Sequence, residues 1–327
     1  MLARNAESLY WIGRYVERAD DTARILDVAV HQLLEDTTVN PDRTTRRVLQ
    51  VLGLPQPPAK DDLDVWGLTE LVAYSKNGDG SIVDSIGHAR ENARGAREVT
   101  STETWECLNT TYVGLGEAER QARKLGPSEF LDYVTNRAAM FAGLADATLS
   151  HDEGYRFLVL GKSIERVDMT VRMLLSRAGD RPGSPSWMTV LRSAGAVDTY
   201  LRTYRGALDA SRVVEFLLLD RLFPRSVFYA LSEAEFCLDH LDHRTNSRVG
   251  ARAEAQRILG RARSALEFMP PGILLEDLQP LLLELQETCR EVNEAVAAQY
   301  FHVSPYVAWT DAAAKNDQEH FIEESEL

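Results

Sequence analysis

Apolar residues recur at three- and four-residue spacing over long stretches of the chain, and this spacing predicts helices nearly everywhere. Turn-forming residues are few and gather at six breaks, which are 54–60, 77–80, 126–127, 179–185, 223–224 and 269–272. The segments between the breaks predict about ten helices. Ser101 and the run Pro127-Ser128-Glu129 carry the residues of helix starts. We find no convincing strand pattern, so we predict an all-α fold built as a single large multi-helix bundle.

One helical segment occurs twice in the sequence. Gly13–Leu26 (GRYVERADDTARIL) aligns with Gly161–Leu174 (GKSIERVDMTVRML) at an offset of 148 residues, and seven of the fourteen positions are identical. Chance would give about one match over this length. We interpret the match as an internal repeat of a Glu-Arg helix, in helices near 5–37 and 153–178.

Each copy of the repeat carries an apolar stripe beside charged ones. The apolar stripe is Ile12, Val16, Ala19, Ala23 and Leu26 in the first copy and Leu160, Ile164, Val167, Val171 and Leu174 in the second. Beside it run Gly13, Glu17, Asp20 and Arg24, matched by Gly161, Glu165, Asp168 and Arg172; Arg14, Arg18 and Thr22, matched by Lys162, Arg166 and Thr170, form a further stripe. Glycine weakens a helix, so we expect each one to permit close approach of another helix or of a ligand.

The repeated charges permit two interpretations. Asp20 with Arg24, and Asp168 with Arg172, are acid-then-base pairs of a kind that many helices carry. Identical polar residues between apolar ones are hard to explain as surface, so the first interpretation is a partly buried ion-pair network at a helix interface. The second is a ligand site, in which arginines hold a carboxylate or phosphate and carboxylates hold an amine.

Two other kinds of site fit the residues less well. A carboxylate-bridged metal pair would use the Glu-x-x-Asp of both copies, but no Glu-x-x-His accompanies it and arginines already supply counter-charge. We therefore predict no metal. Gly161-Lys162-Ser163 ends like a phosphate-binding loop, yet Arg156 stands where that motif needs a glycine. We accordingly predict no cofactor in this chain.

Composition and charge restrict the partners. The chain has 327 residues, 44% of them hydrophobic and 26% charged, with a formal net charge of -14. This charge repels phosphate backbones and anionic lipids, so we expect neither nucleic acid nor membrane as a partner. Six acids and one lysine in 310–327 predict an acidic, flexible tail after a helical domain at 1–309. Three scattered cysteines, with no signal peptide and no membrane-length apolar run, indicate core thiols and a cytoplasmic protein.

Four segments of the chain carry a family pattern when they are taken together. They are Leu2–Val28 with Glu17-Arg18, Ala89–Asn109, Phe157–Leu174 with Glu165-Arg166, and Val214–Val227. These segments resemble the bacterial alpha-E family, all-helical proteins named for a Glu-Arg motif, and the resemblance spans most of 1–305. It implies an all-α fold. It also implies partners, because family members accompany a circularly permuted ATP-grasp ligase and often a transglutaminase-like protein. The resemblance thus suggests ATP-dependent formation or processing of amide or peptide bonds, with ATP and Mg²⁺ bound by the partner ligase.

Carried over position by position, the resemblance selects candidate site residues. The candidate catalytic residues are Glu17, Arg18, Glu165 and Arg166, whose glutamates would bind an amine or act as acid and base. The candidate ligand-binding residues are Arg14, Asp20, Arg24, Arg90, Glu91, Asn92, Arg94, Asp168, Arg172, Asp220, Arg221 and Arg225. The expected ligand is an amino acid, a small peptide or another anionic or zwitterionic molecule.

Several alternatives stay open from the residues. The donors around Arg90 and Arg94 also suit a solvated amphipathic helix. Pro224 would start the helix that follows it, so Asp220 and the two nearby arginines fit either an anion site or a capped corner. The whole chain could also be a non-catalytic scaffold that docks the ligase, or a carboxylate-bridged metalloenzyme.

Overall fold

The computed structural model describes residues 1–36, 39–56, 63–76, 80–178, 186–205, 208–242, 253–269 and 278–301. These residues form thirteen α-helices and two short π-helical segments, η1 (Glu70–Tyr74) and η2 (Ala297–Phe301), and contain no strand. The predicted all-α fold is confirmed. The helices outnumber the expected ten because α3 (Val65–Thr69), α8 (Ser186–Ser193) and α9 (Val197–Tyr204) are too short to show a helical period in the sequence.

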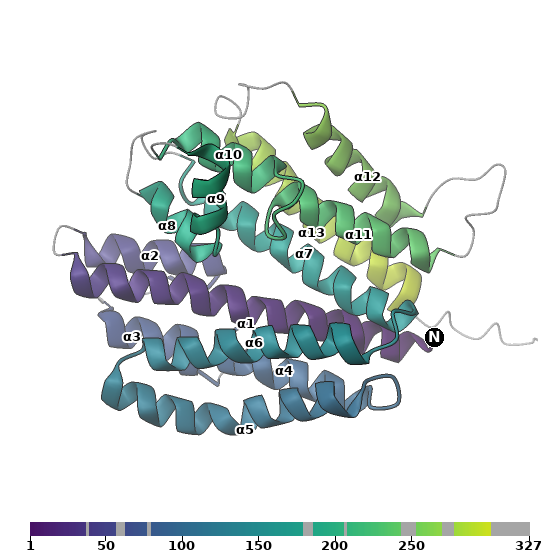
Figure 1. Ribbon diagram of the computed structural model, residues 1–327, viewed down its shortest axis with the longest axis horizontal. Coiled ribbons are helices and arrows are strands. Elements are labelled where there is room, and N and C mark those ends of the chain that lie inside the picture. Colours follow the sequence, from purple (N-terminus) through teal and green to yellow (C-terminus); the bar gives the residue numbers. More distant parts are fainter. Residues whose placement is uncertain are drawn as a thin grey trace, which may run out of the picture.

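Two long helices, α1 (Ala3–Glu35) and α7 (Glu153–Leu175), pack side by side at the centre of the molecule. One group of helices, α4 (Ile82–Gly95), α5 (Thr102–Leu125) and α6 (Ser128–Thr148), lies on α1; the other, α11 (Val227–Leu241), α12 (Glu254–Glu267) and α13 (Leu278–Val296), lies on α7. Figure 1 shows the first group below α1 and the second above it. Each copy of the repeated segment is therefore the inner helix of its own group.

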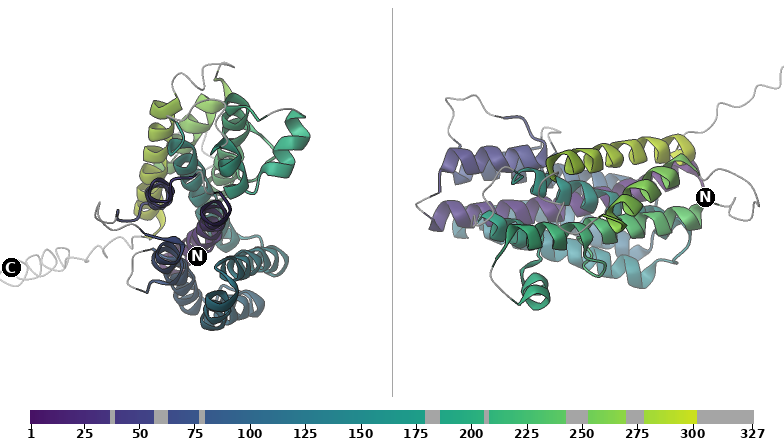
Figure 2. Two further views of the ribbon diagram at one scale, coloured as in Figure 1. Left: turned by 90° about the vertical axis from the view of Figure 1, so that its left-hand side faces the viewer. Right: turned by 90° about the horizontal axis from the view of Figure 1, so that it is seen from above.

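The shorter helices cover the end of the molecule where α1 finishes. Helix α2 (Pro41–Leu52) packs on both central helices, and α8 packs on α1 and contacts α9 and α10 (Ala210–Leu219). The left-hand view of Figure 2 looks along the long axis and shows α1 between the two larger groups. None of the described helices is long and apolar enough to cross a membrane.

Two of the three expected helix starts are confirmed and one is wrong. Ser101 caps α5 by accepting the Thr104 N–H at 3.2 Å, and α6 begins at Ser128. Pro224, however, does not begin α11, which starts at Val227. Ser226 caps that helix instead, because its hydroxyl can accept a backbone N–H that would otherwise have no partner in the helix.

The two predicted apolar stripes form the centre of the core. All ten of their residues are at most 6% exposed, and they belong to a hydrophobic cluster shared by both helix groups. The three cysteines are buried and free, as expected of core thiols. The predicted domain boundary at 309 and the acidic tail at 310–327 lie outside the described residues.

Candidate functional site

Two glycines bring α1 and α7 into backbone contact. A Cβ atom on Gly13 would lie 2.1 Å from the Leu158 carbonyl oxygen of α7, and one on Gly161 would lie 2.0 Å from the Tyr10 carbonyl oxygen of α1. No larger residue fits without moving a helix. The close approach expected of the repeated glycine is thus made by the other helix.

The glutamate of each Glu-Arg pair binds the arginine of the opposite helix. Glu165 accepts hydrogen bonds from Arg18 Nε at 2.6 Å and from Arg14 Nε at 2.7 Å. Glu17 accepts one from Arg166 Nε at 2.6 Å. The Glu165 side chain is 1% exposed and that of Glu17 is 7% exposed. The four candidate catalytic residues therefore form two reciprocal ion pairs across the helix crossing, with both glutamates buried and both arginines partly exposed. Together with the residues bonded to them, these pairs are the ion-pair network.

Arg225 extends the Glu17 half of this network from the turn before α11. Its guanidinium pairs with Glu17 at 3.0 Å and also with Asp20 and Asp21. Oxygens of these three carboxylates lie within 4.8 Å of one another, as they would around a metal ion. The guanidinium instead supplies the positive charge among them, because it has enough N–H donors for several carboxylate oxygens. That this chain holds no metal stays a prediction.

The arginines keep both glutamates ionised. Burial alone would raise the pKa of the Glu165 carboxyl, but the charges of Arg14 and Arg18 outweigh it and lower this pKa to about 2. At Glu17, burial would likewise raise the pKa of the carboxyl, but the charges of Arg225 and Arg166 outweigh it and lower this pKa. A carboxyl group with such a pKa carries no proton to donate near pH 7 and is a weak base.

Asp21 has the opposite behaviour, and the sequence did not single it out. Burial raises the pKa of this carboxyl to about 8, although Arg225 acts in the other direction. The residue is 2% exposed, and its Oδ2 has no hydrogen-bond partner among the described residues. Asp21 is not part of the repeated pattern, because the matching position in the second copy is Met169.

Replacing Asp21 by asparagine is expected to remove a pH dependence of stability. The folded protein keeps a proton on Asp21 up to about pH 8, whereas the unfolded chain releases it near 3.8. Because the folded state binds more protons in this window, its free energy of unfolding falls as the pH rises through it. The free energy of unfolding of D21N should therefore rise relative to that of the wild type, by on the order of a few kcal/mol between about pH 5 and pH 9. Urea unfolding of both proteins measures this, and a difference that does not change with pH would contradict it.

One charged cavity, of about 180 Å³, lies on the Glu17 side of the crossing, between α1, α6 and α7. Asp20, Arg24 and Lys162 line it, together with parts of the ion-pair network. Arg24 Nε donates to Asp20 at 3.1 Å. Burial and the nearby Arg166 lower the pKa of the Lys162 amine, against the pull of the Glu17 carboxylate.

A second charged cavity, of about 490 Å³, lies on the other side of the crossing, against α13. Asp168, Arg172 and Arg14 line it, and Arg172 Nε donates to Asp168 at 3.0 Å. At the offset of 148 residues these three positions match the aspartate, arginine and lysine of the first cavity. The two copies of the repeated helix thus place three matched charged positions in each of two cavities, one on each side of their crossing. The other charged lining residues differ, with Glu17, Arg166 and Arg225 in the first cavity and Glu287 and Arg290 in the second.

Helix α13 also enters the network, which the sequence did not predict. Asn293 Oδ1 accepts hydrogen bonds from Arg14 Nη1 and from the Tyr10 hydroxyl, each at 3.0 Å. Asn293 also lines the second cavity. An asparagine in an otherwise ordinary amphipathic helix carries no signal that would have selected it.

The Arg90 group lies elsewhere, where α4 packs on α5. Arg90 Nε donates to Asn109 Oδ1 at 2.9 Å, and both Arg90 and Arg94 pair with Glu91. Asn92 donates back to its own helix. These contacts join α4 to α5 and stabilise α4, as the amphipathic-helix interpretation implies. Their role in ligand binding stays a prediction.

The candidate residues Asp220, Arg221 and Arg225 do not form one site. Asp220 Oδ1 accepts two backbone N–H groups of the turn that follows α10, which is a capped corner. Arg221 pairs with Glu267 at 3.2 Å and is 63% exposed. Of this group, Arg225 alone has a described contact with the ion-pair network.

The fold and the site together define an all-helical protein whose two central helices are joined by reciprocal glutamate–arginine pairs. The Alpha-E family, described as a predicted alpha-helical domain with a conserved ER motif, matches residues 1–301. The chain belongs to this family. In this protein a Glu-Arg pair stands in each central helix, and each pair supplies the ion-pair partners of the other.

The curated relatives that match are uncharacterised proteins of Mycobacterium bovis and of two strains of Mycobacterium tuberculosis. Each is 24% identical over 324 aligned residues. The alignment covers 90% of this chain and 36% of each relative, so the chain spans about a third of their length. No solved structure matches the chain.

Proposed function

We propose that this protein is the ligand-binding component of a system that forms or processes amide or peptide bonds together with an ATP-grasp ligase. The observation that carries this proposal is the pair of cavities with matched charges. At the three positions that match, each offers one aspartate and two cationic side chains, and further acidic and basic residues line both cavities. In such a set, the aspartate can bind the amine of an amino acid or short peptide. The cationic side chains can bind the carboxylate of the same ligand.

The glutamates of the network have a supporting role in this proposal. Their pKa values are lowered, and both oxygens of Glu165 already accept arginine N–H groups. A general acid or base would need a pKa nearer neutrality. We therefore assign Glu17 and Glu165 to holding the arginines and the crossing in place, while Arg24 and Arg172 contact ligand in the two cavities.

In this proposal a partner acts on the same ligand. Most of each mycobacterial relative lies outside the aligned region, which leaves room for a second domain on the same polypeptide. In the proposed system the ligase binds ATP and Mg²⁺, a transglutaminase-like protein processes amide bonds, and the complex works in the cytoplasm. A non-catalytic scaffold is the second candidate, favoured by the burial of both glutamates of the network.

Reconstitution with the ATP-grasp ligase of the same organism tests the proposal. We expect this chain to increase ligase-dependent amide product, measured by mass spectrometry beside ATP hydrolysis. The double variant R24Q/R172Q should reduce that increase about 10-fold, since each charged hydrogen bond to the ligand contributes on the order of 1.5–3 kcal/mol. The control is R120Q, which removes an exposed arginine of α5 that pairs with Glu117.

Each outcome of the reconstitution separates the candidates. If the chain increases product and R24Q/R172Q does so equally well, the scaffold candidate replaces the ligand-binding one. If product and ATP hydrolysis are the same with and without the chain, the link to the ligase is wrong. Thermal unfolding of the double variant confirms that it is folded, because neither arginine is in the hydrophobic core.

A further inference from the structure

A third cavity lies away from the helix crossing, at the end of the molecule covered by the short helices. Its volume is about 430 Å³, within the range of small-molecule sites. The walls come from the last turns of α1, from α2, from the end of α7 and from α8. This cavity shares no described lining residue with the two cavities beside the crossing.

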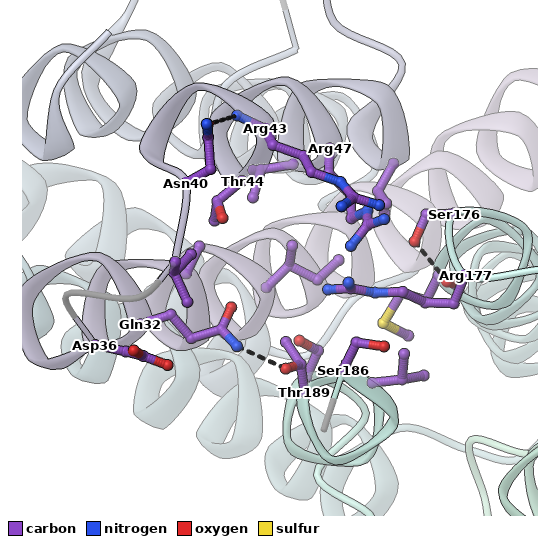
Figure 3. Close-up of a pocket in the computed structure, with 18 residues that line it drawn as sticks. Gln32, Asp36, Asn40, Arg43, Thr44, Arg47, Ser176, Arg177, Ser186 and Thr189 are labelled. Carbon is purple, nitrogen blue, oxygen red and sulfur yellow. Dashed lines mark hydrogen bonds between the residues drawn. The ribbon is translucent and has the colours of Figure 1, made fainter. Parts of the chain in front are cut away.

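Positive charge gathers on one side of this third cavity. Arg43 and Arg47 of α2 and Arg177, just after α7, line it, and Figure 3 shows their head groups turned toward one another. Asp36 is the one carboxylate among the described lining residues, and it lies apart from the arginines in Figure 3. Among the described lining residues, three arginines thus stand against one carboxylate, although the whole chain has a net charge of -14.

The two arginines of α2 that line the cavity lie on one face of this helix. Arg43 and Arg47 are four residues apart, which places their side chains one turn above each other. Arg46, which pairs with Asp42 at 2.8 Å, does not line the cavity. A guanidinium has five N–H donors, so an arginine that already has one partner can still bind the oxygens of a ligand.

The floor of the cavity is apolar. It is formed by Ile25, Ala29, Val48, Val51 and Met173, each at most 6% exposed. A ligand that filled this cavity would place its anionic end on the arginines and bury a hydrophobic part below them.

The walls are held in place by bonds of their own. Gln32 Nε2 of α1 donates to Thr189 Oγ1 of α8 at 2.7 Å and joins two walls. The Asn40 side chain accepts the Arg43 N–H at 2.9 Å and fixes the start of α2. The arginines are thus carried on elements that are already positioned, which reduces the entropy lost when a ligand binds.

We propose that this third cavity binds a small organic oxyanion, a phosphate or carboxylate group attached to an apolar body. The arginines of α2 hold the oxyanion and the apolar floor holds the rest. The site is separate from the proposed function, and its ligand reaches none of the residues assigned to the helix crossing.

Titration calorimetry of the full chain at constant ionic strength tests this site with four probes: phenyl phosphate, benzoate, inorganic phosphate and phenol. Phenyl phosphate should bind at least about 10-fold more tightly than inorganic phosphate, because the ring buries apolar surface. Phenol, which lacks the oxyanion, should give no measurable binding. Benzoate shows whether a carboxylate serves as well as a phosphate.

Variants locate the binding. R43Q and R47Q should each weaken phenyl phosphate about 10-fold or more, since each removes charged hydrogen bonds. R46Q is the matched control, because it removes the same charge from the same helix but does not line the cavity. Ala29→Leu, which fills the floor without changing any charge, should abolish binding, and thermal unfolding confirms that each variant is folded.

The proposal is overturned by any of three results. The first is that phenyl phosphate gives no heat of binding at millimolar concentration, and the second is that phenol binds as tightly as phenyl phosphate. The third is that the variants fail to locate the site, either because R43Q and R47Q bind phenyl phosphate like the wild type or because R46Q loses as much affinity as they do. That result would place binding elsewhere or attribute it to unspecific charge.

Discussion

Replacing Gly13 or Gly161 by alanine is expected to destabilise the protein by about 3 kcal/mol or more, although only one methyl group is added. The new Cβ atom would lie about 2 Å from a backbone carbonyl oxygen of the facing helix, and a backbone atom cannot rotate out of the way as a side chain can. The helices must therefore separate, which lengthens the ion pairs beside the glycines. Urea unfolding measures the loss.

Two glycines elsewhere in the bundle provide the control. Gly116 of α5 and Gly143 of α6 have no atom within 4 Å of the position of an added Cβ. Alanine should raise stability there, by up to about 1 kcal/mol, because it favours helix over the unfolded chain. If G13A and G161A are as stable as G116A and G143A, the central helices do not meet at the glycines.

Replacing Glu165 by glutamine is expected to lower the free energy of unfolding by about 3 kcal/mol at neutral pH. The change leaves the buried Arg14 and the partly exposed Arg18 without their counter-charge. The pH dependence identifies the cause. The pKa of Glu165 is about 2 in the folded protein, against 4.5 for an ordinary glutamate. Its stabilisation is therefore complete above about pH 5 and is lost as the pH falls from about 4.5 to about 2.

Acid unfolding of the variant should show the missing contribution. The wild type loses stability steeply across that acidic window, whereas E165Q has no carboxyl to protonate at this position and should lose less. The control is E117Q, because Glu117 also pairs with an arginine but is 58% exposed, and such a pair contributes only about 0–1 kcal/mol. Equal stability of E165Q and E117Q would show that the network is not buried in solution.

These two results affect how functional data are interpreted. Substitution of Glu17 or Glu165 weakens the helix crossing, so a loss of activity in such a variant does not by itself report on contact with ligand. Arg24 and Arg172 are better probes of ligand binding, because their side chains are 33% and 28% exposed and line the cavities.

Much of the fold follows from local pattern. The helices, the two apolar stripes and the repeated Glu-Arg segment were all predicted, because helical period and residue identity can be detected within one segment. The glutamate and the arginines of each copy were also selected as a site, and the glycine as a point of close approach. The structure shows that the arginines of one helix bind the glutamate of the other rather than their own neighbour.

The rest depends on contacts between distant segments. Arg225 reaches Asp20 from 205 residues away, and Asn293 reaches Arg14 from 279 residues away. Such pairs form when whole helices dock, and a single sequence carries no local signal for which helix packs on which. The protonation of Asp21 has the same origin, because burial sets its pKa and burial is a property of the assembled bundle.

The sequence by itself determined the long helices, the apolar stripes and the chemical content of the central helices, since all of these arise from the order of residues within a helix. Only the tertiary structure decided that the charges pair reciprocally and that two matched cavities flank the crossing. It also decided that three arginines from α2 and the end of α7 gather over an apolar floor. Cavities and ion-pair partners exist where helices meet, and the geometry of that meeting depends on the packing of the whole bundle.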